Sequence, residues 1–225
     1  MAERFQNRTD AGHQLAGALA RYAGRNDVVV LGLPRGGVPV AYEIAGALDA
    51  PLDVFIVRKL GLPGHEEFGI GAIASGGTRV VNESVLQAYG VDEETLDRIT
   101  TSELRELERR ERLYRDGRPF PALDDRIVIL VDDGLATGST MRAAVAALRE
   151  KHPREIVIAV PVGARETCSA MTPMADEVVC LETPDPFYAV GLWYVDFEQT
   201  DDDEVHELLR RAAARSAPPA ERGSS

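Results

Sequence analysis

The sequence has few cysteines and no long hydrophobic run. Its two cysteines, Cys168 and Cys180, occur without a Cys-x-x-Cys motif, and the four histidines are scattered. This argues against a structural zinc site and a disulfide framework, so we predict two buried free thiols in a reducing cytoplasm. Apolar stretches such as residues 28–31 and 156–162 are far shorter than the roughly 20 residues that cross a bilayer. We therefore expect a cytoplasmic protein without a membrane partner.

Lysine is almost absent, because 23 of the 25 basic residues are arginine and only Lys59 and Lys151 are lysine. The 37 acidic side chains bring the formal net charge to −12. So negative a surface repels nucleic acid, and we expect no nucleic-acid partner, although a local basic pocket is compatible with this charge. Hydrophobic residues make up 44% of the 225 residues, which is enough for a full core in one domain with an elaboration or in two small ones.

Apolar strands alternate with helices along most of the chain. Strands are predicted at residues 27–33, 52–57, 79–81, 127–131, 155–160 and 177–181, and helices at residues 10–22, 39–48, 92–115, 140–151 and 165–171. Thr9 or Asp10 is expected to cap the first helix. Strands that are apolar at every position are buried on both faces, as in a parallel sheet. The alternation predicts an α/β fold with a mainly parallel sheet.

The region between the second and third long strands is different in composition. Residues 59–77 are rich in glycine and show little periodicity, which predicts a functional, mobile loop without regular structure. The helix predicted at residues 92–115 is highly charged and carries a narrow apolar stripe. The stripe consists of Leu96, Ile99, Leu104, Leu107 and Leu113. We interpret this helix as a solvated element lying on the core, because its acidic residues match its arginines.

Residues 127–140 carry the most informative pattern. A hydrophobic strand ends in two aspartates, and small and hydroxylated residues then lead into a helix. The backbone amides of residues 136–140 are free at a helix N-terminus, and the side chains of Thr137, Ser139 and Thr140 add donors. We predict a phosphate site there, formed by Ala136, Thr137, Gly138, Ser139 and Thr140. Neither a Walker A loop nor a Gly-x-Gly-x-x-Gly motif is present.

The paired carboxylates of Asp132 and Asp133 stand directly beside this phosphate site. Ionised carboxylates are acceptors, and the vicinal hydroxyls of a ribose are matching donors worth roughly 1.5–3 kcal/mol each. We therefore assign both residues to ribose binding. The alternative is that they cap the helix or bind a metal ion alone.

Residues 131–140 resemble the phosphoribosyl pyrophosphate (PRPP) binding signature of the type I phosphoribosyltransferases. One departure is Gly134, where an aliphatic residue is commoner in that family. The resemblance implies a five-stranded parallel core, at about residues 25–182, with a small hood at about residues 183–210. It implies a single domain over residues 1–215 with the mobile loop and helix inserted at 59–116, and we predict a disordered tail at residues 216–225.

Two further segments are similar to loops of this family. Residues 33–38 resemble its pyrophosphate loop, in which Arg35, Gly36 and Gly37 would bind pyrophosphate, although an ordinary tight turn has the same composition. Residues 57–64 resemble the start of the mobile catalytic loop of adenine-type enzymes. The resemblance gives Arg58 and Lys59 a catalytic role toward the departing pyrophosphate. The alternative is two exposed basic residues at a strand end.

The identity of the acceptor is less constrained. Alanine at position 136 resembles the corresponding residue of the adenine-type enzymes, which slightly disfavours a 6-oxopurine as the acceptor. Glu66 or, as our choice, Glu67 is the local candidate for an acid that protonates the base. Residues 186–197 hold five of the 13 aromatic side chains and distantly resemble the hood of hypoxanthine-guanine enzymes. Phe187 and Trp193 are candidates for stacking on the base, and packing under the hood is the alternative.

The resemblance implies transfer of the 5-phosphoribosyl group from PRPP to a nitrogenous acceptor, with a purine base favoured and pyrophosphate released. Mg²⁺ is the implied cofactor, bound through PRPP rather than by a protein metal site, with Asp132 and Asp133 as its nearest protein groups. A PRPP- or nucleotide-sensing regulator without turnover is the alternative function. The expected partners are PRPP and the acceptor, with a homodimer as one option.

Overall fold

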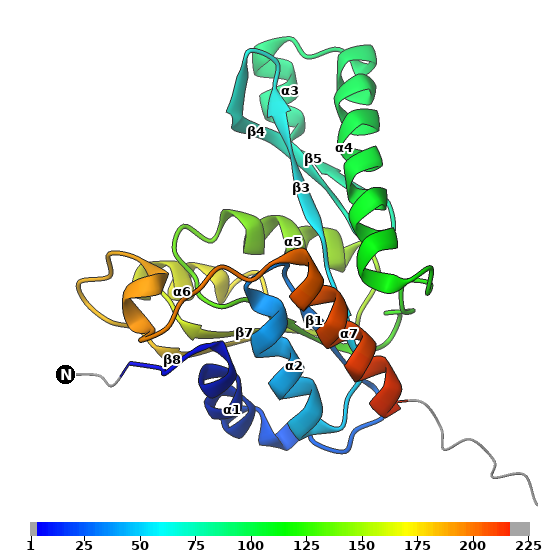
Figure 1. Ribbon diagram of the computed structural model, residues 1–225. Coiled ribbons are helices and arrows are strands. Elements are labelled where there is room, and N and C mark those ends of the chain that lie inside the picture. Colours follow the sequence, from blue (N-terminus) through cyan, green and yellow to red (C-terminus); the bar gives the residue numbers. More distant parts are fainter. Residues whose placement is uncertain (1–3, 217–225) are drawn as a thin grey trace, which may run out of the picture.

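The apolar strands of the sequence assemble into one parallel sheet (Figure 1). This computed structural model describes residues 4–216, without the side chains of Glu66, Glu67 and Ser216. The strands are β1 (Val28–Gly32), β2 (Leu52–Val54), β6 (Ile127–Val131), β7 (Glu155–Val162) and β8 (Glu177–Glu182), in the order β2-β1-β6-β7-β8. β1 and β6 are neighbouring strands of this sheet and are buried at every position. The predicted α/β fold with a five-stranded parallel core is confirmed.

Helices cover both faces of this sheet (Figure 1). They are α1 (Arg8–Ala18), α2 (Gly37–Leu48) and α7 (Asp202–Ser216) on one face, and α5 (Ser139–Arg149) and α6 (Arg165–Met171) on the other. Successive residues of a strand point to opposite faces, so Val28 and Val30 join the first core whereas Val29 and Leu31 join the second. This double coverage explains why the strands are apolar throughout.

The first helix begins earlier than its predicted caps. The side chain of Asn7 accepts a hydrogen bond from the amide of Asp10 at 2.9 Å, and the Asp10 carboxylate accepts one from the amide of Gln6 at 2.9 Å. This reciprocal pattern resembles a capping box, in which Asn7 is the N-cap. The prediction of Thr9 or Asp10 as the cap was therefore wrong, since both lie inside the helix.

Residues 57–115, which lie between β2 and β6 in the sequence, form an arm that projects from the core (Figure 1). It contains an antiparallel sheet of β3 (Val57–Leu62), β4 (His65–Ala74) and β5 (Thr78–Val81), followed by α3 (Glu83–Tyr89) and α4 (Glu93–Arg115). The prediction of a loop without regular structure at residues 59–77 was wrong, because these residues form most of a hairpin. Glycines interrupt the alternation of side chains, yet Leu60, Leu62 and Ile70 are buried and Gly64 turns the chain at a φ of 77°.

The apolar stripe of α4 faces the rest of the molecule as predicted. Leu96 and Leu107 are buried, and Ile99 and Leu104 pack partly against the same core, whereas Leu113 is exposed. The stripe therefore holds the arm helix against β3 and α7 while most of its charged side chains other than Arg115 are at least partly exposed to solvent.

Arg115 ties the last turn of α4 to the core. Its side chain is only 3% exposed, its Nε donates to Asp53 Oδ1 at 2.9 Å, and its Nη2 donates to the carbonyl of Val54 at 2.9 Å. A third contact, at 2.7 Å, joins its Nη1 to Glu111. These contacts connect the base of the arm to β2.

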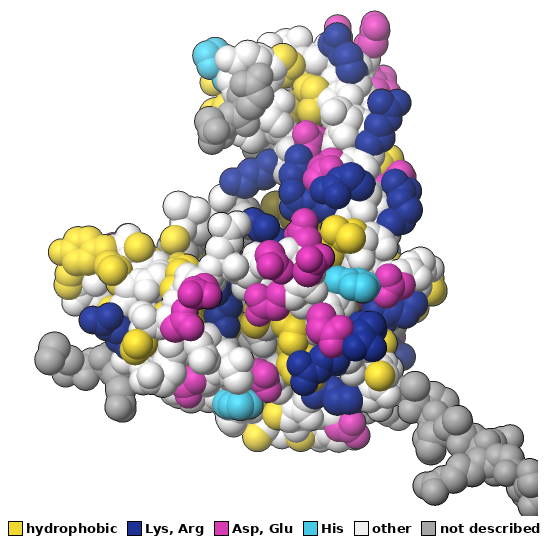
Figure 2. Space-filling view, in the orientation of Figure 1, with side chains coloured by type: hydrophobic (Ala, Val, Ile, Leu, Met, Phe, Trp, Pro, Cys, Tyr) yellow, Lys and Arg dark blue, Asp and Glu magenta, His cyan; other side chains and the backbone are white. Residues whose placement is uncertain are grey.

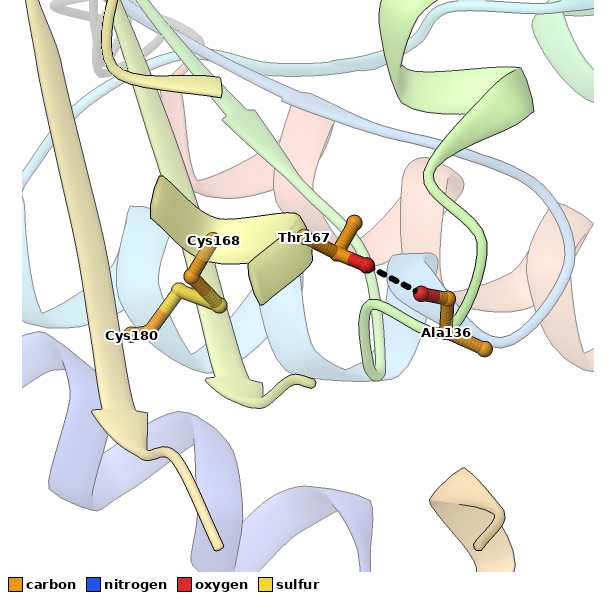
Figure 3. Close-up of a disulfide and its surroundings, with 4 residues drawn as sticks. All are labelled: Ala136, Thr167, Cys168 and Cys180. Atoms are coloured by element: carbon orange, nitrogen blue, oxygen red, sulfur yellow. Dashed lines mark hydrogen bonds between the residues drawn. A yellow bond between two sulfur atoms is a disulfide. The ribbon is translucent and has the colours of Figure 1, made fainter. Parts of the chain in front are cut away.

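The two cysteines form a disulfide between α6 and β8 (Figure 3). The prediction of two free thiols was wrong. Residues 12 apart in the sequence become neighbours because α6 packs back onto the strand that follows it. The 12-residue spacing of the cysteines alone could not predict the disulfide, because the pairing depends on the path of the chain between α6 and β8.

The segment in which the hood is predicted, at about residues 183–210, contains irregular backbone and the first part of α7. Residues 183–201 are mostly irregular and contain a short 3₁₀ helix, η2 (Val190–Trp193), before α7. Ser216 is the last residue of α7, and the remainder of the predicted tail, residues 217–225, lies outside the described residues. Within residues 4–216, no helix has the length and apolar character needed to span a membrane.

Replacing Arg115 by Met should destabilise the protein strongly. The buried Asp53 carboxylate would lose its counter-ion, at a cost of about 3–5 kcal/mol at pH 7. Burial already raises the pKa of Asp53, and loss of Arg115 raises it further. The folded variant would then hold a proton that the unfolded chain has lost, so its stability falls as pH rises, and the deficit should be larger at pH 7 than at pH 4.5.

Urea unfolding at the two pH values measures both effects. Arg112→Met is the matched control, because Arg112 lies on the same helix turn, is 70% exposed and contacts Glu108 only at 3.8 Å. It should change the free energy of unfolding by less than about 0.5 kcal/mol. Equal losses in the two variants would contradict the role of Arg115.

Candidate functional site

The predicted phosphate cradle lies where β6 ends and α5 begins. Gly138 adopts a φ of 72° and precedes the first helical residue, Ser139. The side chains of Ala136, Thr137, Ser139 and Thr140 are exposed, so the amide end of α5 is open to a ligand. This end of the helix therefore offers backbone and hydroxyl donors on one surface.

Helix α6 supports the cradle from beneath. The hydroxyl of Thr167 donates to the carbonyl of Ala136 at 2.7 Å (Figure 3). A side chain on Gly138 would overlap Thr167 and Met171, so glycine is required at this position for packing as well as for its backbone conformation.

The arm reaches the cradle through Lys59. Its Nζ lies 2.9 Å from Ser139 Oγ, although the two residues are 80 positions apart in the sequence. Arg58, the neighbouring residue on β3, instead forms an ion pair with Glu103 of α4, with Nη2 2.6 Å from Oε2. Of these two neighbours on β3, Lys59 contacts the cradle at α5 whereas Arg58 contacts α4.

The glycine turn after β1 packs directly against the two aspartates. A side chain on Gly36 would overlap the Asp133 carboxylate, and one on Gly37 would lie 2.6 Å from the carbonyl of Val131 and 2.9 Å from Cα of Asp132. The amide of Leu33 donates to the carbonyl of Val131 at 2.8 Å. The sequence therefore needs glycines here because two backbone segments approach each other closely.

Arg35 belongs to this same turn and is partly buried. Its carbonyl accepts a hydrogen bond from the amide of Val38 at 3.1 Å, which leads the turn into α2. The turn that carries Arg35, Gly36 and Gly37 thus lies beside the carboxylates at the carboxyl ends of adjacent strands.

Arg8 is a member of the site that the sequence analysis missed. Its Nε donates to Asp133 Oδ2 at 2.9 Å, its Nη2 lies 2.8 Å from the same oxygen, and its Nη1 donates to the carbonyl of Glu198 at 2.6 Å. The guanidinium also stacks 4.0 Å from the centre of the Phe197 ring. No sequence motif marks Arg8, because its partners are 125 and 190 residues away.

The electrostatics of the two carboxylates follow from burial. Burial raises the pKa of Asp132, and repulsion from Asp133 raises it further. Burial also raises the pKa of Asp133, whereas the positive charge of Arg8 lowers it. Arg8 therefore favours the ionised form of a carboxylate that its surroundings would otherwise disfavour.

The hood closes over the loop beside the cradle. A side chain on Gly134 would overlap Val190 of η2, and the hydroxyl of Tyr194 donates to the carbonyl of Asp133 at 2.6 Å. Val190 therefore fills the space that a side chain at position 134 would occupy. This packing accounts for glycine at a position where the related signature more often has an aliphatic residue.

The remaining candidates are not brought to the cradle by any contact that the structure describes. Phe187 and Trp193 are partly buried and pack against the small hood core that contains Phe5 and Tyr194. Their stacking role stays a prediction. The backbone of Glu67, like that of Glu66, belongs to β4, and both side chains lie outside the described part of the structure.

The central strand of the parallel sheet leads into two carboxylates and an open helix N-terminus, and a glycine turn faces them. This is the arrangement that the resemblance to the type I phosphoribosyltransferases implies. The chain belongs to the phosphoribosyl transferase domain family, whose model matches residues 3–197.

Known relatives agree with this family. Two curated Mycobacterium tuberculosis proteins, from strains CDC 1551 / Oshkosh and H37Rv, are each named "Putative phosphoribosyl transferase" and are 49% identical to this chain over 208 residues. The match covers 92% of this chain and 47% of each relative, so the chain spans about half their length. The crystal structure of the protein TT1426 from Thermus thermophilus is 43% identical, has a TM-score of 0.83 and covers 92% of this chain and 98% of its own.

The contact between Gly134 and Val190 predicts a compensating pair of substitutions. Gly134→Ala should destabilise the protein by about 1–3 kcal/mol, because the new methyl group displaces the hood. Val190→Ala removes the overlapping methyl groups, so the double variant should lose less stability than the sum of the single variants. Thermal unfolding of all four proteins measures this coupling. Additive losses would show that position 134 does not pack on Val190.

The bond between Arg8 and Asp133 predicts a role for Arg8 in ligand binding. Arg8→Ala should weaken PRPP binding about tenfold, because the Asp133 carboxylate loses the partner that orients it and favours its ionised form. Arg8→Lys should recover part of the affinity. Calorimetric titration with PRPP tests this, and Arg21→Ala, which removes an arginine paired with Glu177, is the control. Wild-type affinity in Arg8→Ala would contradict the role.

Proposed function

We propose that this protein is a phosphoribosyltransferase that moves the 5-phosphoribosyl group from PRPP to a nitrogenous acceptor and releases pyrophosphate. The observation that carries the proposal is the convergence of the paired aspartates, the open amide end of α5 and the glycine turn at one edge of the sheet. These groups match the ribose hydroxyls, the 5-phosphate and the pyrophosphate of a single PRPP molecule.

Each group has a proposed task in this reaction. Asp132 and Asp133 accept hydrogen bonds from the ribose hydroxyls, and the amides and hydroxyls of residues 136–140 hold the 5-phosphate. The turn at residues 35–37 holds pyrophosphate through its backbone and through Arg35. Lys59, which already contacts Ser139, supplies positive charge from the arm. The rate then comes from positioning and from stabilising the departing negative charge.

The donor set is compatible with Mg²⁺ carried by the substrate. Within residues 4–216 no group of three or more His, Cys, Asp or Glu side chains could hold a metal ion. Mg²⁺ commonly uses one or two carboxylates together with substrate phosphates and water, which fits Asp132 and Asp133 beside bound PRPP. When bound, the ion neutralises charge on the pyrophosphate.

A nucleobase is the proposed acceptor, with a purine first. Ala136 in the cradle supports this order, and the hood aromatics Phe187 and Trp193 are the proposed partners of a flat ring. Arg58 is proposed to act only after it leaves Glu103, since that ion pair directs it away from the cradle. Glu67 remains the proposed acid. A cytoplasmic location and a homodimer also remain predictions.

Replacing both Asp132 and Asp133 by Asn should weaken PRPP binding by an order of magnitude or more. Asn keeps the shape of each side chain but removes the charge that strengthens a hydrogen bond to a ribose hydroxyl. Calorimetric titration with PRPP and Mg²⁺ measures the affinity. Asp97→Asn is a matched control, because it also removes a carboxylate that contacts an arginine, Arg79, but has no contact with a proposed site residue. Unchanged affinity in the double Asn variant would contradict the ribose assignment.

Turnover is tested separately with a panel of bases. Adenine, hypoxanthine, guanine, uracil and orotate are incubated with PRPP and Mg²⁺ while pyrophosphate release is followed. Release with one base supports the transferase and identifies its acceptor. Tight binding of PRPP without release for any of these bases would favour the sensing function instead.

A further inference from the structure

A cleft of about 740 Å³ lies between β3 and α4 and extends along the arm from Pro63 in the hairpin turn to Thr140 of α5. Its polar lining includes Arg58, Lys59, Thr95, Arg98, Ser102 and Glu103. It meets the cradle only at Thr140 and contains no residue of the aspartate pair or the glycine turn. Figure 2 shows Lys and Arg side chains gathered around the hollow where the arm joins the core. The cleft is therefore adjacent to the PRPP cradle but separate from its ribose and pyrophosphate ends.

The charges of this cleft are unbalanced. Three cations line it against one carboxylate, Glu103, and that carboxylate is already paired with Arg58. Lys59 contacts only the hydroxyl of Ser139, and Arg98 donates to the hydroxyl of Thr95 at 3.0 Å. Neither cation forms an ion pair with a carboxylate among the side chains that the structure describes, although the positive charge of Arg98 acts on the nearby Asp92 carboxylate. In a chain of net charge −12, such a positive cleft attracts anions.

The spacing along α4 arranges donors for such an anion. Thr95, Arg98 and Ser102 are three and four residues apart, so they share one face of the helix. Ile99, on the same face, and Pro63 of the hairpin turn add an apolar wall to the cleft. The volume lies in the range of sites that bind small molecules. The cleft thus combines cationic donors with an apolar surface suited to a ring.

We propose that this cleft is a second ligand site, which binds a phosphorylated small molecule of nucleotide size. The phosphate lies between Arg98 and Lys59, hydroxyls of α4 add hydrogen bonds, and the heterocycle contacts Ile99 and Pro63. This site goes beyond the proposed transfer reaction and does not depend on turnover. Because Lys59 borders both sites, a ligand in the cleft would lie next to the 5-phosphate of PRPP.

Calorimetric titration with ADP, inorganic pyrophosphate and adenosine tests the site. The binding that is lost in Arg98→Gln should be tighter for ADP than for pyrophosphate. Wild-type protein should bind adenosine at least about tenfold more weakly than ADP, because adenosine lacks the charged group. Arg98→Gln should weaken ADP about tenfold or more, and Arg98→Glu should abolish its binding. PRPP affinity should be unchanged in Arg98→Gln, which separates this site from the cradle.

Arg79→Gln is the matched control. It removes one arginine from the same arm, but Arg79 pairs with Asp97 at 2.8 Å and does not line the cleft. ADP affinity should therefore equal that of the wild type. Hydrogen exchange supplies the location, because ADP should protect residues 93–103 in the wild type and not in Arg98→Gln.

Several results would overturn the proposal. These are absence of ADP binding, equal loss of ADP affinity in Arg79→Gln and Arg98→Gln, and protection confined to residues 132–140. Adenosine binding as tight as ADP would overturn the anionic part, and Arg98-dependent binding of pyrophosphate that is tighter than that of ADP would overturn the nucleotide part. Failure of PRPP to bind or turn over would instead count against the proposed function, so the two failures are distinguishable.

Discussion

The site depends on the close approach of two backbone segments at the carboxyl ends of β1 and β6. Gly36 and Gly37 pack on Val131, Asp132 and Asp133 so tightly that no side chain fits between them. The two strands are neighbours in register, which brings their following loops together. This contact fixes the distance between a turn of backbone amides and a pair of carboxylates. The remaining site residues add charge and hydrogen bonds to an arrangement that the sheet has already determined.

Most of the core could be predicted from the sequence because its signals are local. Strands that are buried on both faces are apolar at every position, and the loop at residues 132–140 has a composition that only a helix N-terminus explains. The arm hairpin was missed because glycines at 61, 64, 69 and 71 hide the alternation of its side chains. The contact between Lys59 and Ser139 depends on how the hairpin sits on α5, which no local pattern encodes.

Arg8 and the disulfide both show that contacts between separate elements could not be predicted from the sequence. Arg8 is an ordinary arginine in the first turn of a helix, and its role comes entirely from Asp133 and Glu198, which lie more than 100 residues away. Cys168 and Cys180 are close in sequence, but their pairing depends on how α6 folds back on β8. Residue type and spacing therefore suffice for a cradle built from consecutive residues, but not for contacts between separate elements.

The supports of the cradle differ in how they could respond to a ligand. α1 reaches it through Arg8, the hood through Val190 and Tyr194, and α6 through Thr167, and all of these elements belong to or pack on the core. The arm, in contrast, is a separate antiparallel sheet and helix pair whose side chain on the cradle is Lys59. A shift of the arm would change the charge beside the cradle without disturbing the carboxylates or the glycine turn. Among the described elements, the arm is thus the one best placed to regulate the site, because it combines a contact with the cradle and a second positive cleft.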